Sequence, residues 1–341
     1  HRSRAMSRFR RGLVVAILAA IVHSLLNGGF LEWVTRRVSR HPNLGGPSWR
    51  ATQWEDSMQR IARADKEAPT ANWLFRAVSG LGHARETLDY PSGWGNTKHG
   101  INLADAGKEL LQKHHLMLEN GYLRLRDGSV MLAAYTPLPK CTAKHLDWWF
   151  AFCDTVEKFT WAHPEDHVFA QWSESGIPIR DRRPGWIFNK SLLLREFHSR
   201  DQGGNETSLQ ISFSSPSQYG VDDRALAAVG VGFWVFGRIS IQHPAVGRVE
   251  IGHLSLQVRD GENGAELRTH IWLGQINLVS GYGPIVDIPA NIIGNSWLLR
   301  TLLADEAAAA RLLRHVKEEA ACVAVSLPSL FLAENARGYF V

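Results

Sequence analysis

Residues 247–273 read GRVEIGHLSLQVRDGENGAELRTHIWL, and this stretch decides the fold class. Its two flanks, 247–259 and 267–273, are β-like runs rich in Val, Ile and Leu. Asp260-Gly261 and Asn263-Gly264 lie between them, and Asp-Gly and Asn-Gly are the pairs that tight hairpin turns favour. The stretch therefore predicts an antiparallel hairpin.

Further β-like runs precede the hairpin, and several alternate apolar with polar residues, as Ser208-Leu-Gln-Ile-Ser-Phe does. These runs cover residues 122–125, 129–136, 192–198, 208–213 and 230–241. Helical spacing of apolar residues is found over residues 54–64, 104–120, 144–158 and 295–332. The last of these helices is expected to end at Pro328.

This order of helices, then strands, then a long C-terminal helix predicts an α+β fold. A curved antiparallel sheet that grips one long helix would enclose a cavity between the two. We divide the chain into an N-terminal helical and loop region, residues 1–121, and a domain of residues 122–341, because the pattern changes from helical to β-like at Tyr122.

The composition describes a globular protein with a substantial core, since 45% of the 341 residues are hydrophobic and 13 are Trp. The net charge is only +5, and no basic stripe with interleaved aromatic residues is found, so nucleic acid is not an expected partner. The three cysteines are Cys141, Cys153 and Cys322, an odd number without a CxxC motif. A disulfide framework and a cysteine zinc site are therefore not expected, and a cytoplasmic location fits best.

The N-terminus contains an apolar run, residues 13–26, after a basic segment that includes RFRRG. This run is shorter than the roughly 20 apolar residues of a membrane-spanning helix. Three interpretations stay open: a packing or dimerisation helix, a signal-like anchor, and an upstream extension to which residues 1–5 would belong. Gly28-Gly29 follows the run as a helix stop, which favours the first interpretation over membrane association through residues 7–33.

The C-terminal helix carries the first candidate metal ligands, His315 and Glu319. Their i, i+4 spacing places both side chains on one face of the helix, where an imidazole and a carboxylate can reach one metal ion. The same spacing is also that of a solvated pair, so it does not decide the matter alone.

Two more features supply ligands of the same kind. Residues 161–167 read WAHPEDH, which offers His167 as a ligand with Asp166 or His163 as its support, although a polar loop would look similar. Glu196 shares a strand face with leucines, where a carboxylate is costly unless it is paired or bound to metal. The alternative for Glu196 is an edge strand in water.

Two histidines and two glutamates form a plausible zinc set with room for water or a substrate oxygen. Other chemistries have little support in this sequence. There is no G-x-S-x-G nucleophile elbow and no phosphate-binding P-loop. The glycines at 230 and 232 lack the third glycine of a dinucleotide-binding loop.

The sequence from residue 122 to residue 332 resembles the diacetylphloroglucinol hydrolase family, of which phloretin hydrolase is a relative. The resemblance rests on six motifs in a fixed order. They are LDWWF at 146–150, WAHPEDH at 161–167, Glu196 in its strand, ISFSSPSQYG at 211–220, ELRTHIWLG at 266–274, and His315-x-x-x-Glu319 before Leu327-Pro328.

The resemblance implies a zinc-dependent hydrolase that cleaves the carbon–carbon bond between an acyl group and a phenolic ring, an activity on ketonic substances. It also implies a helix-grip fold, like START domains and pollen allergens, and a homodimer formed through the N-terminal region. The zinc ligands carry over to His167, Glu196, His315 and Glu319. Phe159 stands where the family tends to have Tyr, and RTHIWLG replaces the family's RSRFWLG.

Such a reaction needs an acid that protonates the ring carbon and a base that takes a proton from water. The base would be zinc-bound hydroxide assisted by Glu196 or a neighbour, and the acid would be His253, on a strand expected to face the cavity. A histidine buried in the sheet is the alternative for His253. We expect Phe159, His270 and Tyr282 to contact an acylated phenol. The competing function is a non-catalytic carrier of hydrophobic small molecules.

Overall fold

The structure is a computed structural model that describes residues 69–173, 185–200, 203–204, 206–243, 247–279 and 284–335. Several predictions fall outside these residues: the apolar run 13–26 within residues 7–33, the upstream residues 1–5, the helix at 54–64, and Tyr282 as a substrate contact. None of the described helices is long and apolar enough to cross a membrane.

The described chain forms one eight-stranded antiparallel sheet with the strand order β1-β2-β8-β7-β6-β5-β4-β3. The strands are β1 (Gly121–Arg124), β2 (Val130–Pro139), β3 (His167–Trp172), β4 (Ser191–Phe197), β5 (Glu206–Ser214), β6 (Val231–His243), β7 (Gly247–Gly261) and β8 (Gly264–Val279). The predicted hairpin is confirmed as β7 and β8, which close at the pair Gly261 and Gly264. Gly264 has a φ of +132°, a conformation that glycine adopts without strain.

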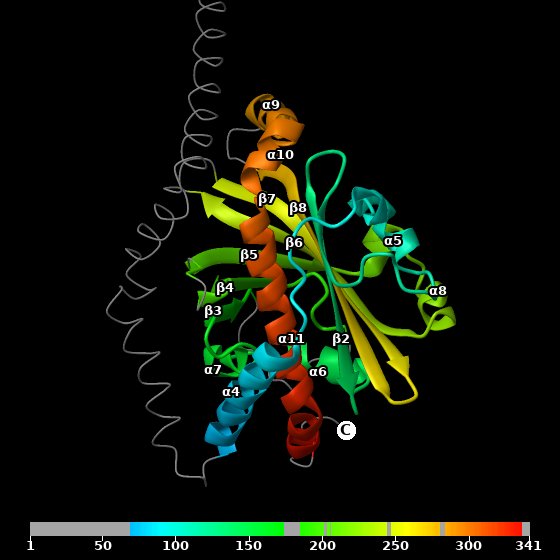
Figure 1. Cartoon of the computed structure of the whole chain (residues 1–341), viewed down its shortest axis with the longest axis vertical. Helices are drawn as coiled ribbons and strands as arrows, with labels where there is room; N and C mark the ends of the chain where they lie inside the picture. The colour runs from blue at the N-terminus through cyan, green and yellow to red at the C-terminus, as the bar shows by residue number, and fades with distance from the viewer. Residues whose placement is uncertain are drawn as a thin grey trace, which may run out of the picture.

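The helices are α4 (Pro69–Thr87), α5 (Ala106–Glu109), α6 (Ala143–Phe152), α7 (Val156–Thr160), α8 (Asp223–Ala228), α9 (Pro284–Gly294), α10 (Trp297–Leu303) and α11 (Glu306–Asn335). Short 3-10 turns are η1 (Thr97–His99), η2 (Leu103–Asp105) and η5 (Pro216–Tyr219). Figure 1 shows the curved sheet with α11 running across it and α4 beside the C-terminal half of α11. The predicted α+β class, with an antiparallel sheet and a long C-terminal helix, is confirmed.

The main core lies between the sheet and α11. It joins Leu132 and Leu194 of the sheet to Leu313 and Leu327 of the helix, all of them buried. The helix continues through Pro328 to Asn335, so the predicted end at Pro328 is wrong. Leu327 and Leu330 are at most 1% exposed, and this packing holds the last turns although Pro328 has no N–H to donate.

A second core covers the opposite face of the sheet, which we call the outer face. Buried Trp234 and Trp272 of the sheet pack there against Leu110 and Leu118. The predicted helix over 104–120 is wrong beyond Glu109, because the carbonyls of residues 110, 112 and 113 accept hydrogen bonds from the Arg259 guanidinium instead of from backbone N–H groups. The chain there serves as a cover for the sheet.

Candidate metal centre

His167 and Glu196 face each other across two neighbouring strands. His167 is the first residue of β3 and pairs with Glu196 in β4. The His167 ring stacks on Phe159 with centroids 3.9 Å apart, and its Nδ1–H donates to the Phe159 carbonyl over 2.9 Å. Its Nε2 is buried with no hydrogen-bond partner among the described residues and lies 3.6 Å from Glu196 Oε2. One nitrogen is thus fixed, and the other is free to bind a ligand.

His315 and Glu319 approach the same point from one face of α11. His315 Nε2 lies 3.8 Å from Glu196 Oε2, and Glu319 Oε1 lies 3.8 Å from His167 Nε2. Ligand atoms of His167, Glu196 and His315 all lie within 4.8 Å of one another. The structure therefore brings together all four residues that the sequence predicted as metal ligands.

Asp166 orients one of these histidines. Its carboxylate accepts the Nδ1–H of His315 over 2.8 Å and the backbone N–H groups of Ser199 and Arg200 over 2.8 and 2.9 Å. Burial opposes ionisation, but the hydrogen bond from His315 and the neighbouring imidazoles hold the pKa of Asp166 well below its usual range. A carboxylate behind a histidine is a common way to set the tautomer of a metal ligand.

His163 lies beside this group but has no free nitrogen. Its Nδ1 accepts the backbone N–H of Asp166 over 3.1 Å, and its Nε2–H donates to Glu318 over 3.3 Å. Glu318 is in turn paired with Arg85 and Arg314, and the Arg314 Nε lies 2.6 Å from its carboxylate. These contacts make His163 and Glu318 a charge-balanced structural pair.

Glu196 and Glu319, by contrast, face imidazoles without any Lys or Arg ion pair among the described residues. Burial lowers the pKa of His167 to about 3. Burial also works against a charge on His315, but its hydrogen bond to Asp166 and the carboxylates of Glu196 and Glu319 raise its pKa to about 9. Burial and the charges of Glu196 and Asp166, against the effect of His315, raise the pKa of Glu319 to about 7.

This donor set fits a divalent metal ion. An unpartnered buried Nε2 atom, a second imidazole fixed by a carboxylate, and two glutamates without a cation are the features that such an ion would satisfy. Without an ion, the negative charges of the two glutamates are compensated only by a proton on His315 or on Glu319.

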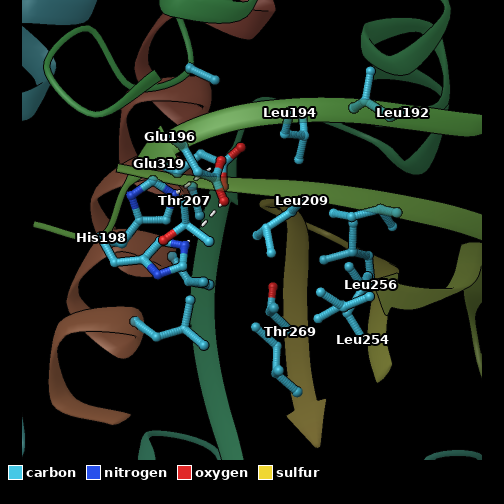
Figure 2. Close-up of a pocket in the computed structure, with 18 of the residues that line it drawn as sticks. Leu192, Leu194, Glu196, His198, Thr207, Leu209, Leu254, Leu256, Thr269 and Glu319 are labelled. Carbon is cyan, nitrogen blue, oxygen red and sulfur yellow. Dashed lines mark hydrogen bonds and ion pairs between the residues drawn. The ribbon is translucent and has the colours of Figure 1, made fainter. Parts of the chain in front are cut away.

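The cluster opens into a cavity of about 390 Å³ between the sheet and α11. Figure 2 shows Glu196, His198 and Glu319 together at one end and Leu192, Leu254 and Leu256 at the other. His198 Nε2 lies 3.2 Å from Glu196 Oε1. His198 is not among the site residues predicted from the sequence, although it follows Glu196 at the two-residue spacing that places side chains on the same side of an extended chain.

Phe159 lines the cavity, and its contact with a substrate stays a prediction. His253 and His270 instead lie on the outer face. Cavity-lining Leu254 and Leu256 alternate with His253 along β7, so the His253 ring points away and its Nδ1 lies 3.0 Å from Tyr219 Oη. Thr269 and Ile271 line the cavity on either side of His270, whose side chain is therefore on the far face and fully buried.

Comparison with known proteins gives one family. Residues 101–332 match the family described as "DAPG hydrolase PhiG domain", and this range includes all four candidate ligands. The sequence matches no curated protein. Among solved structures, "Crystal structure of Ara h 8.0201" is similar at 8% identity with a TM-score of 0.26, over 52% of this chain and 100% of that chain.

Proposed function

Because this chain belongs to the DAPG hydrolase PhiG domain family, we propose that it is a zinc-dependent hydrolase that cleaves the carbon–carbon bond between an acyl group and a phenolic ring. The observation that carries the proposal is the free, buried Nε2 of His167, which faces two glutamates that no Lys or Arg neutralises among the described residues. The cluster lies at one end of a cavity that can hold a small aromatic ketone.

The proposed reaction consumes one water. The bond between the ring carbon and the carbonyl carbon breaks, and the water oxygen becomes bonded to the carbonyl carbon. One water proton ends on the ring carbon, so the products are the deacylated phenol and a carboxylic acid. The chain must therefore hold the carbonyl, take a proton from water and deliver a proton to the ring.

His167, Glu196, His315 and Glu319 would hold the ion, with Asp166 and the Phe159 carbonyl fixing the two imidazoles. A bound zinc ion supplies polarisation of a carbonyl oxygen and lowers the pKa of water to about 7. Glu196 can assist in taking the proton from water, because its Oε2 faces the two imidazoles and its Oε1 faces His198.

We assign the proton donor to His198 and not to His253. His198 lines the cavity and contacts Glu196, so it can receive a proton from that side and present it to the ring carbon. His253 lies across the sheet from the cavity, beside Tyr219. His270 lies on the outer face too, and Tyr282 stays a prediction as a substrate contact.

The proposal extends to the architecture. A curved sheet around one long helix is the arrangement of a helix-grip domain, which we assign to residues 122–341. We propose that residues 1–121, part of which packs against α11 and the outer face of the sheet, support a homodimer, and that the protein acts in the cytoplasm.

The second candidate is a carrier of hydrophobic molecules, which the largely aliphatic cavity wall favours. Elemental analysis of protein purified without added metal, followed by assays with mono- and diacetylphloroglucinol, separates the two functions. We expect about one zinc per chain and one acetate released per deacylated ring, both lost after chelation and restored by zinc. A protein that binds these phenols without metal and without turnover would be a carrier.

A further inference from the structure

The cavity wall changes character along two neighbouring strands. Residues two apart on a strand share a face, so Glu196, Leu194 and Leu192 of β4 line the cavity in turn. The register pairs Glu196 with Thr207, Leu194 with Leu209 and Leu192 with Ile211. Both strands therefore run from a polar end at Glu196 and Thr207, called the metal end, to an aliphatic end at Leu192 and Ile211. Four residues of strand separate the two ends by roughly 13 Å.

The remaining strands continue the aliphatic end. Figure 2 shows Leu254 and Leu256 there, well separated from His198 and Glu319. Further apolar side chains of the wall are Ile239, Ile241, Ile271, Leu273 and Phe213. Apart from the four candidate ligands, the imidazole and hydroxyl side chains that line the cavity are those of His198, Thr207 and Thr269. His198 and Thr207 lie at the metal end.

This change from polar to aliphatic side chains determines which end of the cavity each half of an acylated phenol occupies. A ring hydroxyl buried among leucines would lose its hydrogen bonds, at a cost of roughly 5- to 150-fold in binding. His198 and Thr207 offer partners at the metal end, so the ring belongs there. The acyl carbon must also lie at the metal end, and its chain is then left to extend toward Leu192.

Resting on the proposed function, we propose that the substrates are phenols with a medium-chain aliphatic acyl group, and that the end of the cavity formed by Leu192, Ile211, Leu254 and Leu256 is the acyl-chain site. An acetyl group would leave this end without an occupant. Each methylene that enters it is removed from water, which favours longer chains up to the size of the cavity.

The test is a series of acetyl-, butanoyl-, hexanoyl- and octanoyl-phloroglucinol assayed with the zinc-loaded full chain. We expect kcat/KM to rise about fourfold per methylene, and by at least about 100-fold from acetyl to octanoyl. An acetyl substrate that is hydrolysed as well as the octanoyl one would overturn the inference and leave the hydrolase proposal intact.

Two adjacent leucines provide a matched pair of variants. Leu192 lines the cavity, whereas Leu193 is 39% exposed on the other face of the same strand. Leu192→Phe should lower the octanoyl-to-acetyl ratio of kcat/KM at least tenfold, and Leu193→Phe should leave it unchanged. Equal ratios in the two variants would contradict an acyl-chain site. Leu254→Phe narrows the same end from β7 and replaces Leu192→Phe should that variant not fold.

Binding of alkylresorcinols, which have no bond to hydrolyse, separates the two proposals. Calorimetry should give a Kd that falls as the alkyl chain lengthens from ethyl to octyl. Should this trend hold while no acylated phenol is hydrolysed, the hydrolase proposal fails and the apolar site remains. Should acetyl phenols be hydrolysed while the alkyl chain adds no affinity, the acyl-chain site fails and the hydrolase remains.

Discussion

The two faces of the sheet each bury a carboxylate beside histidine. On the cavity side is the inner cluster, formed by His167, Glu196, His315 and Glu319. On the opposite side is the outer cluster, formed by Glu119, Gln257, Arg259, Arg268 and His270. The outer cluster has its own cation, because Arg268 donates through Nε to Glu119 over 3.0 Å and through a second nitrogen to the same carboxylate.

The difference lies in what neutralises the glutamates. Burial works against ionisation of Glu119, but its hydrogen bonds and charge pairing with Arg268 lower its pKa. In the inner cluster the pKa of Glu319 rises to about 7, first of all because of burial. A buried carboxylate with an arginine is a complete structural unit, whereas carboxylates that face only imidazoles must be neutralised by a proton or by a metal ion. The inner cluster is therefore where a metal is expected.

The largest effect should come from removal of an inner ligand. His315→Ala or Glu319→Ala takes away one donor and should lower zinc affinity by at least about 100-fold, the upper end of the effect of removing a mere supporting residue. Hydrolysis of an acylated phenol should fall below detection in both variants. His270→Ala on the outer face is the control and should keep its zinc, measured by elemental analysis. Full zinc content in His315→Ala would break the contrast between the faces.

A second pair of variants tests the proton donor. His198→Asn should lower kcat by about 10²- to 10⁴-fold, the usual contribution of general acid–base catalysis, with zinc content retained. His253→Asn removes an imidazole of the outer face and should keep kcat near that of the unchanged protein. Comparable losses in the two variants would place the proton donor elsewhere.

His253 also shows where the sequence analysis reached its limit. The spacing of His315 and Glu319 on a helix, and of Glu196 on an alternating strand, predicted three candidate ligands whose side chains the structure brings together. Along β7 the alternation is shifted by an irregularity between Glu250 and Gly252, so the face of His253 depends on pairing with β6 and β8. That information is not local to the sequence.

Two other features could not be predicted from the sequence for the same reason. The strand β3 is only six residues long and follows the turn that contains Pro164, so its pattern did not predict a strand although it begins with His167. The cover of the outer face has helical spacing at 110–120, yet its carbonyls bond to Arg259 across the molecule. Tertiary hydrogen bonds overrode local propensity at that segment.

For the outer cluster we predict the opposite outcome, which is a loss of stability without a loss of zinc or activity. Arg268→Met leaves Glu119 buried without its cation and should lower the free energy of unfolding by about 3 to 5 kcal/mol, as for other broken buried pairs. Zinc content and kcat of the folded protein should stay unchanged. Arg126→Met, at an exposed arginine, is the control and should stay within about 0.5 kcal/mol. Urea unfolding of the zinc-loaded proteins gives the comparison, and a loss of zinc in Arg268→Met would mean that the faces are coupled.

The smallest effect concerns pH and His270. This ring is fully buried, its nitrogens have no hydrogen-bond partner among the described residues, and burial lowers its pKa to about 3. Its unfolded value is about 6.5. Between these values the unfolded chain binds the proton and the folded chain does not, so stability falls as the pH drops below about 6.5.

At pH 5.5 this single group should lower the free energy of unfolding by about 1.4 kcal/mol relative to pH 8. His270→Gln abolishes the titration and should reduce the loss of stability between pH 8 and pH 5.5 by that amount. The measurement is urea unfolding at both pH values with saturating zinc, so that the inner histidines stay bound in both proteins. An identical pH dependence in the variant would mean that His270 takes up its proton in the folded state, with Glu119, at a distance of 4.0 Å, as the charge that stabilises it.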